Sequence, residues 1–351
     1  MASQTVTQAA PVTLSSQQQP AAKGSEHIKN ADDLLKSLQG VNVSPLWAQM
    51  ARLNPAEPNP TTKPFKWEYD TVRPYLMHAG KLIKEEQAER RVLMLVNPER
   101  TAPYTTDTLY AGLQLVNPRE TAPAHRHAAF AVRFIIEGQG GYTAVQGSRV
   151  AMKPRDVLVT PPWNWHDHGK KGADEEGGDD NPVIWLDGLD LPEFIHFPIH
   201  FNEHYQASRY PAENVDASPI VFPWEKMEAA LKAEPGNWAA VPYLRKNGDE
   251  IGRTIGALAE RLEAGTASPA VRETASSVYH VIEGSGHSTI GDQTLTWKKG
   301  DTFCVPAWYR YQHFAGDAKV YLYRFHDMPM IKALGMYRQE EADREGWVME
   351  Y

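Results

Sequence analysis

An internal repeat is the feature of this sequence that most constrains its fold. The stretch Phe134–Gly140 matches His280–Gly286, and each copy is followed by a polar turn and a further apolar segment. The copies are offset by 146 residues at Glu137 and Glu283, and by 145 residues at the turn that closes the next segment, so one single-residue gap separates them. Such a repeat predicts a duplicated domain.

The segments around the repeat have the texture of β-strands. From about Thr108 onward, short runs rich in Val, Ile, Phe, Tyr and Trp alternate with Gly, Pro, Asn and Asp at intervals of about 8 to 12 residues. This spacing is typical of an all-β sandwich or barrel. Together with the repeat, it predicts two related β-barrels.

The rest of the chain suggests connecting segments. The Gln- and Ser-rich start is too polar to offset the entropy of ordering, except for a short helix near Ala31–Leu35. We expect one or two helices over 73–93, an acidic surface loop at Gly169–Asp180 and a short helix at Glu225–Lys232. The predicted organisation is a flexible tail (1–40), a helical arm (41–95), the first barrel (96–202), a linker (203–246), the second barrel (247–330) and a C-terminal helix (331–351).

Composition excludes several classes of protein. The 351 residues include 36 Lys and Arg against 44 Asp and Glu, which gives a net charge of −8, and no basic stripe is present to bind nucleic acid. The single cysteine, Cys304, allows no internal disulfide and no thiolate metal cluster, which fits a reducing cytoplasm. No apolar stretch approaches the roughly 20 residues that cross a bilayer, and the start lacks a signal peptide. We therefore expect a cytoplasmic protein without a membrane partner.

The sharpest chemical feature is a pair of His-x-His motifs. Residues two apart point to the same face of a strand, so His125 and His127 can bind one ion together, and His166 and His168 repeat the spacing downstream. Arg133 shares the parity of the first pair. A lone His-x-His is often an exposed or hydrogen-bonded pair, but the second cluster lies at the matching place of the barrel repeat. The sequence therefore predicts a metal site between two antiparallel strands.

The second copy of the repeat lacks these imidazoles. Val271 and Glu273 occupy the positions of His125 and His127, and Tyr311 corresponds to His166. His280 and His313 remain in this half, but they align with Phe134 and His168, and we interpret them as packing or hydrogen-bonding residues. We expect the first barrel to be active and the second to be structural.

Several segments of the chain carry a family resemblance: Pro45–Trp47, Glu89–Arg91, Thr108–Gln114, Pro123–His127, Arg133–Gly138, His166–His168 and Trp185–Asp190. Together they resemble the gentisate 1,2-dioxygenase family of bicupins. The resemblance implies an all-β bicupin of two jelly-roll barrels. It also implies an Fe(II)-dependent oxidoreductase with one iron per subunit. Such an enzyme opens the ring of a salicylate-type acid between its carboxyl-bearing and hydroxyl-bearing carbons with O2. Relatives are commonly homotetramers, so the resemblance also implies a homo-oligomer.

The resemblance assigns roles to the histidines. By position, the iron ligands are His125, His127 and His166, and the carboxylate that cupins often add is missing. Three neutral imidazoles leave the full charge of Fe(II) to be neutralised by a carboxylate and a phenolate of the substrate. The open positions can hold the chelating substrate and O2.

Further residues are expected to contact the substrate. Arg133 can form a forked pair with the substrate carboxylate, although an internal salt bridge is its alternative role. His168 can hydrogen-bond the coordinating hydroxyl or bound oxygen, and Asp187 can orient His168. Arg90 and Arg91 resemble family positions that close over the substrate, and the sequence does not say which of the two faces inward.

The pocket wall departs from the family pattern. Tyr110, Gly112 and Gln114 share one face by alternation, and Tyr110 stands where many relatives have Trp. The ring substituent is therefore open: gentisate or another 5-substituted salicylate leads, and salicylate, 5-nitrosalicylate and 1-hydroxy-2-naphthoate are the alternatives. A metal-dependent cupin isomerase or decarboxylase, and a non-enzymatic bicupin that binds small molecules, are the competing classes.

Overall fold

The computed structural model describes residues 28–340. The predicted tail before residue 28 and the last part of the predicted C-terminal helix, 341–351, lie outside the described residues. The described chain divides into a short N-terminal unit that ends at Pro58 and a large unit that begins at Asn59.

Residues 28–58 of the N-terminal unit contain three short helices: α1 (Ala31–Gln39), the 3-10 helix η2 (Leu46–Ala48) and α2 (Met50–Leu53). Helix α1 begins where the sequence places it, because the Asn30 side chain accepts a hydrogen bond from the backbone N–H of Asp33 at 2.9 Å. Apolar side chains of this unit remain exposed, and Trp47 is the most exposed of them at 70%.

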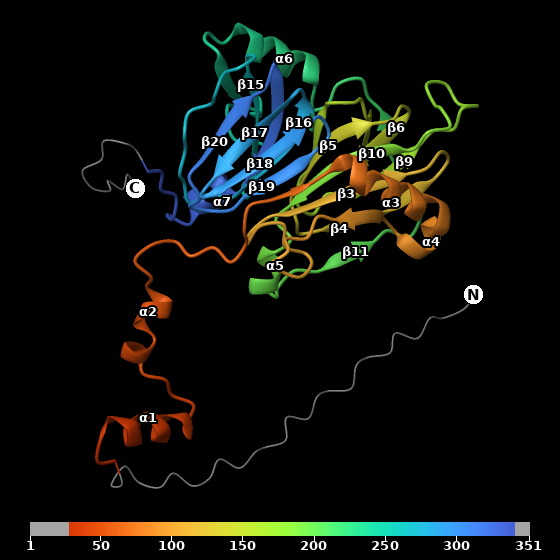
Figure 1. Cartoon of the computed structure of the whole chain (residues 1–351). Coiled ribbons are helices and arrows are strands. Elements are labelled where there is room, and N and C mark those ends of the chain that lie inside the picture. The colour runs from red at the N-terminus through yellow and green to blue at the C-terminus, as the bar shows by residue number, and fades with distance from the viewer. Residues whose placement is uncertain (1–27, 341–351) are drawn as a thin grey trace, which may run out of the picture. The chain divides into compact units, whose positions relative to one another are not determined.

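Two β-barrels make up the large unit (Figure 1). The strands of the first barrel are β3 (Tyr110–Val116), β4 (Thr121–His127), β5 (Ala131–Glu137), β6 (Gly141–Val145), β7 (Ser148–Ala151), β8 (Val157–Thr160), β9 (His166–Lys170) and β10 (Val183–Leu189). Those of the second are β15 (Gly256–Leu262), β16 (Ser277–Glu283), β17 (Ser285–Ile290), β18 (Gln293–Lys298), β19 (Thr302–Val305), β20 (Tyr311–Ala315) and β21 (Val320–His326). The prediction of an all-β chain with two related barrels is confirmed.

Equivalent strands occupy equivalent places in the two barrels. The central order β8-β5-β10-β3 of one sheet matches β19-β16-β21-β15 of another. A β-bulge also recurs, since the pairing of β10 with β5 skips Ile136 and the pairing of β21 with β16 skips Ile282. The duplication seen in the sequence therefore extends to the register of the strands.

Strands from the connecting segments complete both barrels. The sheet of β8, β5, β10 and β3 gains β2 (Arg91–Met94) and β13 (Val221–Phe222). The sheet of β19, β16, β21 and β15 gains β1 (Phe65–Trp67) and β14 (Trp238–Pro242). The sheet of β4, β9, β6 and β7 gains β11 (Asn202–His204) and β12 (Glu213–Asn214). The residues expected to be a linker thus contribute strands to both barrels.

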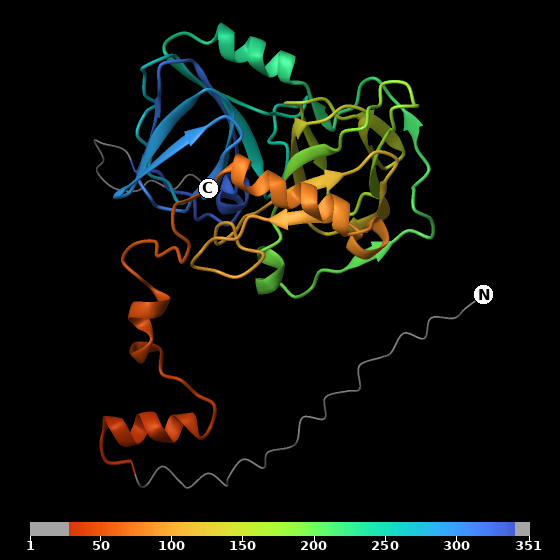
Figure 2. The ribbon, with the colours of Figure 1, turned by 45° about the vertical axis from the view of Figure 1, so that its right-hand side comes forward.

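Short helices lie on the outside of the barrels. Helix α3 (Tyr69–Leu82) lies across β2 and β3, and α6 (Trp224–Ala233) packs on β14 and β15 (Figure 2). The others are α4 (Glu85–Ala88), α5 (Glu193–His196) and α7 (Met328–Ala333). The helical prediction for 73–93 was wrong at its end, where β2 pairs with β3. Helix α7 stops at Ala333, and residues 334–340 are not helical.

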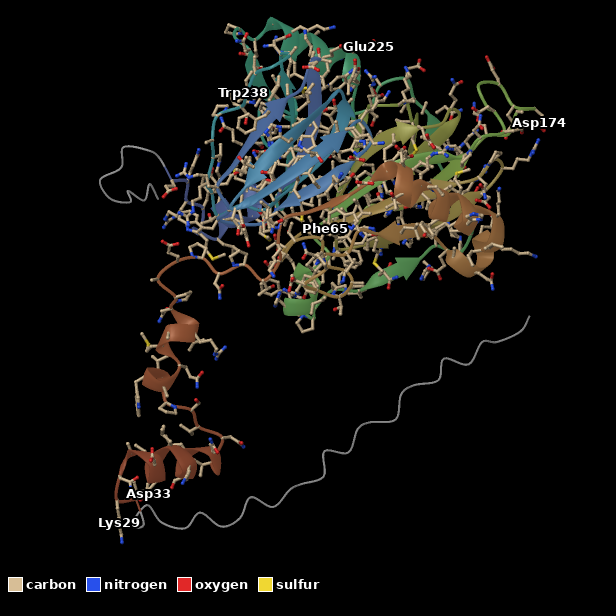
Figure 3. All side chains as sticks on the ribbon, in the orientation of Figure 1. Lys29, Asp33, Phe65, Asp174, Glu225 and Trp238 are labelled. Atoms are coloured by element: carbon tan, nitrogen blue, oxygen red, sulfur yellow. The ribbon has the colours of Figure 1, made fainter. Side chains whose placement is uncertain are left out.

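The main hydrophobic core lies between the facing six-stranded sheets of the two barrels. Phe134 from the first barrel stacks on Tyr323 from the second with ring centroids 4.9 Å apart. Gly188 is required there, since a Cβ would lie 2.7 Å from the Phe325 ring. On the far side of the first barrel, the acidic loop begins after Lys170, and Asp174 lies in its exposed part (Figure 3).

Candidate active site

Three histidines of the first barrel form a compact cluster. Strands β4 and β9 are antiparallel neighbours, and their register places His125 opposite His166, while His127 follows on the same face of β4. The candidate ligand atoms of these three residues all lie within 4.8 Å of one another. Among the residues that the structure describes, this is the cluster of His, Cys, Asp or Glu that fits a metal ion.

Backbone carbonyls fix the orientation of all three imidazoles. Each Nδ1 lies 2.9 to 3.0 Å from a carbonyl oxygen two residues away, and the acceptors are Pro123, Ala129 and Asn164 for His125, His127 and His166. Because a carbonyl can only accept, each Nδ1 must carry the proton, and each Nε2 keeps its lone pair. The Nε2 atoms of His125 and His166 are buried without a partner in the described structure. This donor set fits a divalent transition metal.

The surroundings keep these imidazoles neutral. Burial, followed by the positive charge of Arg90, lowers the pKa of His125 to about 2 and that of His127 to about 4. Burial also holds the pKa of His166 well below its usual range. A neutral imidazole is the form that binds a metal, so the site needs no proton release at neutral pH.

A cavity of about 660 Å³ opens beside the cluster. It is lined by the three histidines and by two guanidinium groups, those of Arg90 and Arg133, with Asp187 as an acidic neighbour. Burial and the nearby charge of Arg133 lower the pKa of Arg90 to about 10. The cavity is therefore suited to an anionic ligand.

Arg133 is held on two sides. Its Nη1 donates to the hydroxyl of Thr160 at 2.5 Å, and its Nε lies 3.1 Å from Oδ1 of Asp187, as an ion pair whose geometry is not that of a hydrogen bond. The structure thus contains the internal salt bridge considered for Arg133, and it also places this residue at the cavity wall.

The two arginines of the N-terminal arm have different surroundings. Arg90 faces the cavity, whereas the buried guanidinium of Arg91 pairs with Glu120 at 2.6 Å and donates to the carbonyl oxygen of Ile83. Arg91 is absent from the cavity wall, so of the two arginines it is Arg90 that lies where a substrate could contact it. The ion pair of Arg91 instead ties β2 to the turn before β4.

The expected contact between Asp187 and His168 is wrong. Asp187 faces Arg133, and neither ring nitrogen of His168 has a hydrogen-bond partner among the described residues. His168 is buried and does not line the cavity, and its ring lies 5.6 Å from that of His166 and 5.4 Å from that of Trp185. Burial holds its pKa well below the usual range.

The strand parity predicted for β3 is correct. Tyr110 and Gln114 line the cavity, and the buried Nε2 of Gln114 has no partner among the described residues. Gly112 lies between them, and a Cβ there would lie 2.7 Å from Cγ1 of Val92 and 3.0 Å from Cζ of Tyr110. Gly112 therefore makes room for the Tyr110 ring, which in turn lines the cavity.

One wall of the cavity escaped the sequence analysis. Its residues follow β10 and include Phe194, His200, Phe201 and Asn202. Strand β11 reaches the site by pairing with β4, with Asn202 opposite His127. No motif announces this contact, because β11 is three residues long and lies far from β4 in the sequence.

A larger cavity of about 890 Å³ lies elsewhere, between α6 and the segments around β13 and β14. Its wall is mostly apolar, and the described histidine cluster is not part of it. We place the chemistry in the smaller cavity, because that cavity combines metal-binding atoms with charged groups. No helix in the described part of the chain is long and apolar enough to span a membrane.

Two jelly-roll barrels, with one three-histidine cluster among the described residues, define the class of this protein as a bicupin with a metal site in one barrel. The family described as "Cupin domain" matches residues 112–176, which include the three histidines.

Comparisons with known proteins define the family. Gentisate 1,2 dioxygenase 1 of Aquipseudomonas alcaligenes is 34% identical over 89% of this chain and 96% of its own length. A 5-aminosalicylate 1,2-dioxygenase from a Comamonas species is 33% identical over 88% of this chain and 90% of its own. The crystal structure of a salicylate 1,2-dioxygenase from Pseudaminobacter salicylatoxidans superposes with a TM-score of 0.79 at 31% identity, covering 89% of this chain and 98% of that one. The chain belongs to the gentisate 1,2-dioxygenase family and is a ring-cleaving dioxygenase.

Proposed function

We propose that this enzyme uses Fe(II) to open gentisate, or a related 5-substituted salicylate, between its carboxyl-bearing and hydroxyl-bearing carbons with O2. The observation that supports this most is the meeting of three neutral imidazoles with two guanidinium groups at one cavity. Bound Fe(II) would supply a centre at which the substrate chelates and O2 is activated. Family membership sets aside the non-enzymatic alternative.

The ligand set favours this chemistry over that of other cupin enzymes. The described cluster contains no carboxylate, so the protein neutralises none of the charge of a divalent cation. A substrate with adjacent carboxylate and phenolate groups supplies the missing negative charge. A metal-dependent isomerase or decarboxylase of the cupin type usually has a carboxylate ligand as well, and the present site lacks it.

Arg133 is our candidate for the carboxylate anchor. Thr160 binds Nη1 of its guanidinium and Asp187 lies beside Nε, while Nη2 has no hydrogen-bond partner among the described residues. A guanidinium held in this way loses little entropy when it binds a carboxylate. Arg90 is the second cation, and it approaches from the N-terminal arm.

Polar groups on β3 are the candidates that select the ring substituent. The Tyr110 hydroxyl and the unpartnered amide of Gln114 both face the cavity, and either can bond to a 5-hydroxyl group. A crystal structure of the related salicylate 1,2-dioxygenase contains adducts with gentisate, and that chain is 30% identical to this one with a TM-score of 0.80. Salicylate, 5-nitrosalicylate and 1-hydroxy-2-naphthoate remain the alternative substrates.

His168 remains in the proposal as a neutral hydrogen-bonding group behind the triad. Its ring nitrogens have no partner in the described structure. Because His168 does not line the cavity, its contact with a bound reactant rests on the family resemblance.

A substrate panel tests the proposal. The protein, loaded with Fe(II) without oxygen, is mixed with gentisate, salicylate, 5-nitrosalicylate and 1-hydroxy-2-naphthoate, and O2 uptake is followed to give kcat/KM. We expect O2 uptake with ring opening and the highest kcat/KM for gentisate. A higher kcat/KM for another acid would make that acid the assigned substrate. If no acid causes O2 uptake, the proposed reaction is refuted.

A further inference from the structure

Asp190, which follows β10, has a buried carboxylate that joins the two barrels. The residue is 4% exposed. Its Oδ1 accepts the backbone N–H of Phe130 at 3.0 Å, and its Oδ2 accepts the hydroxyl of Thr254 at 2.6 Å. Phe130 follows the metal-binding strand β4, whereas Thr254 lies two residues before the start of β15 in the second barrel.

The peptide group held by Asp190 is the one that orients a metal ligand. The N–H of Phe130 and the carbonyl of Ala129 belong to the same planar peptide unit. That carbonyl oxygen lies 3.0 Å from Nδ1 of His127. A continuous chain of hydrogen bonds therefore runs from Thr254 through Asp190 and the Ala129–Phe130 peptide to His127.

This chain affects both the position and the basicity of the imidazole. A carboxylate that accepts from a peptide N–H polarises the peptide, and its carbonyl oxygen becomes a better acceptor. A stronger acceptor at Nδ1 fixes the ring and raises the electron density at Nε2, as carboxylates do when they contact a metal-binding histidine directly. Burial raises the pKa of Asp190, while the bonds from Thr254 and Phe130 oppose this by favouring the ionised form.

Packing reinforces the same contact. Phe130 is 2% exposed, and its ring lies against Gly252 of the second barrel. A Cβ at Gly252 would lie 2.8 Å from two atoms of that ring. The second barrel therefore holds the turn after His127 at two points, one polar and one apolar.

We propose that Asp190 is a positioning residue for the metal ligand His127, and that the second barrel supports the metal site of the first through Thr254. The proposal rests on the proposed function in that it requires metal binding by the triad, but it is independent of which acid is the substrate. It also gives the second barrel, which has no triad of its own, a part in the chemistry.

The test measures the affinity of the full-length apo-protein for Fe(II), without oxygen and in competition with a chelator, alongside the melting temperature. Asp190→Ala removes both hydrogen bonds and should weaken Fe(II) binding by about 10- to 100-fold, the usual effect of losing such a support. Asp190→Asn keeps an acceptor for Phe130 and should fall between Asp190→Ala and the parent. Thr254→Val should weaken binding, while Thr254→Ser should restore it.

Asp156 provides the matched control, because its carboxylate is also buried, at 6% exposure, and also accepts one backbone N–H, that of Trp224 at 2.8 Å. Asp156→Ala should lower the melting temperature and leave the Fe(II) affinity unchanged. Equal losses of affinity in the Asp156 and Asp190 variants, or unchanged affinity in both Asp190→Asn and Thr254→Val, overturn the proposal even if Asp190→Ala does not fold. A parent protein that binds no Fe(II) overturns the proposed function as well.

Discussion

The two barrels share a fold, yet only the first has a described cluster of metal-binding side chains. In the first barrel, His125 of β4 lies opposite His166 of β9. At the same place in the second barrel, an isolated bridge pairs Val271 with Tyr311. The alignment of the sequence repeat is therefore confirmed in space, and the difference between the barrels lies in their side chains.

The second barrel fills its interior with groups that bind one another. Glu273, at the position of His127, forms a buried ion pair with Arg324 and accepts hydrogen bonds from the hydroxyls of Tyr311 at 3.2 Å and Tyr337 at 3.0 Å. Arg324 corresponds to Asp187, because each lies at the equivalent place of the last strand of its barrel. The acidic position of Asp187 is thus basic in the second barrel, and Glu273 neutralises the charge of Arg324 there.

Space differs as well as charge. Asp187 of β10 lies opposite Gly112 of β3, whereas Arg324 of β21 lies opposite Leu258 of β15. Gly112 makes room for the Tyr110 ring, which lines the cavity, whereas the equivalent residue of the second barrel, Leu258, has a large side chain. A barrel of this type therefore forms a metal site where buried imidazole nitrogens keep free lone pairs and a cavity lies beside them.

The largest contrast is expected from removal of an imidazole. His125→Ala, His127→Ala or His166→Ala should abolish iron binding and turnover while the β-rich circular dichroism spectrum persists, because apolar strands hold the barrels together. In the second barrel, Nδ1 of His280 lies 3.0 Å from the hydroxyl of Thr302, so His280→Ala should leave the iron content unaltered. Full iron and turnover in any variant of the triad would contradict the assignment.

The opposite contrast is expected at Glu273, which is 3% exposed. Glu273→Gln leaves the buried charge of Arg324 without its partner, and this should cost about 3 to 5 kcal/mol of unfolding free energy. Denaturant titration measures the loss. The folded fraction should still bind Fe(II), and a variant that is as stable as the parent would show that the second interior is not held by this pair.

A smaller effect is expected at Arg133. Loss of its charge-assisted contact should cost about 2 to 4 kcal/mol of transition-state binding, or about 30- to 1,000-fold in kcat/KM. Arg133→Lys should recover little, because an ammonium cannot reproduce the planar fork. Tyr279→Phe, at the equivalent position of the second barrel, is the control and should leave kcat/KM unchanged. Near-normal kinetics for Arg133→Ala would move the carboxylate anchor to Arg90.

The smallest effect is expected on β3. Gly112→Ala introduces a methyl group that displaces the Tyr110 ring, and it should change the ratio of kcat/KM between substrates by about 1 to 3 kcal/mol without loss of iron. Tyr110→Phe keeps the volume, so it should weaken only a substrate that bonds to the phenol. An equal change for all four acids of the panel would show that β3 does not select the ring substituent.

The sequence was sufficient for the fold class and for the two His-x-His pairs, because both depend on local periodicity and on the repeat, whereas the choice of the triad among these four histidines came from the family resemblance. Alternation along β4 and β9 places the histidines on one face, and the repeat aligns them with the second barrel. It was also sufficient for the face shared by Tyr110 and Gln114.

Contacts between distant segments could not be predicted in the same way. Asp187 was expected beside His168, but the register of β10 against β5 places it beside Arg133. The choice between Arg90 and Arg91 depends on the pairing of Arg91 with Glu120, which no periodicity reveals. The wall formed by Phe201 and Asn202 depends on a chain reversal that returns β11 to β4.

Iron stoichiometry tests the contrast between the barrels most directly. The apo-protein is titrated with Fe(II) without oxygen, and bound iron per chain is measured for the parent and for His166→Ala. The account predicts one Fe(II) per chain in the parent and none at comparable affinity in the variant, because the second barrel has filled its own interior. Two equivalents in the parent, or one retained in His166→Ala, would place a metal outside the triad and contradict the account.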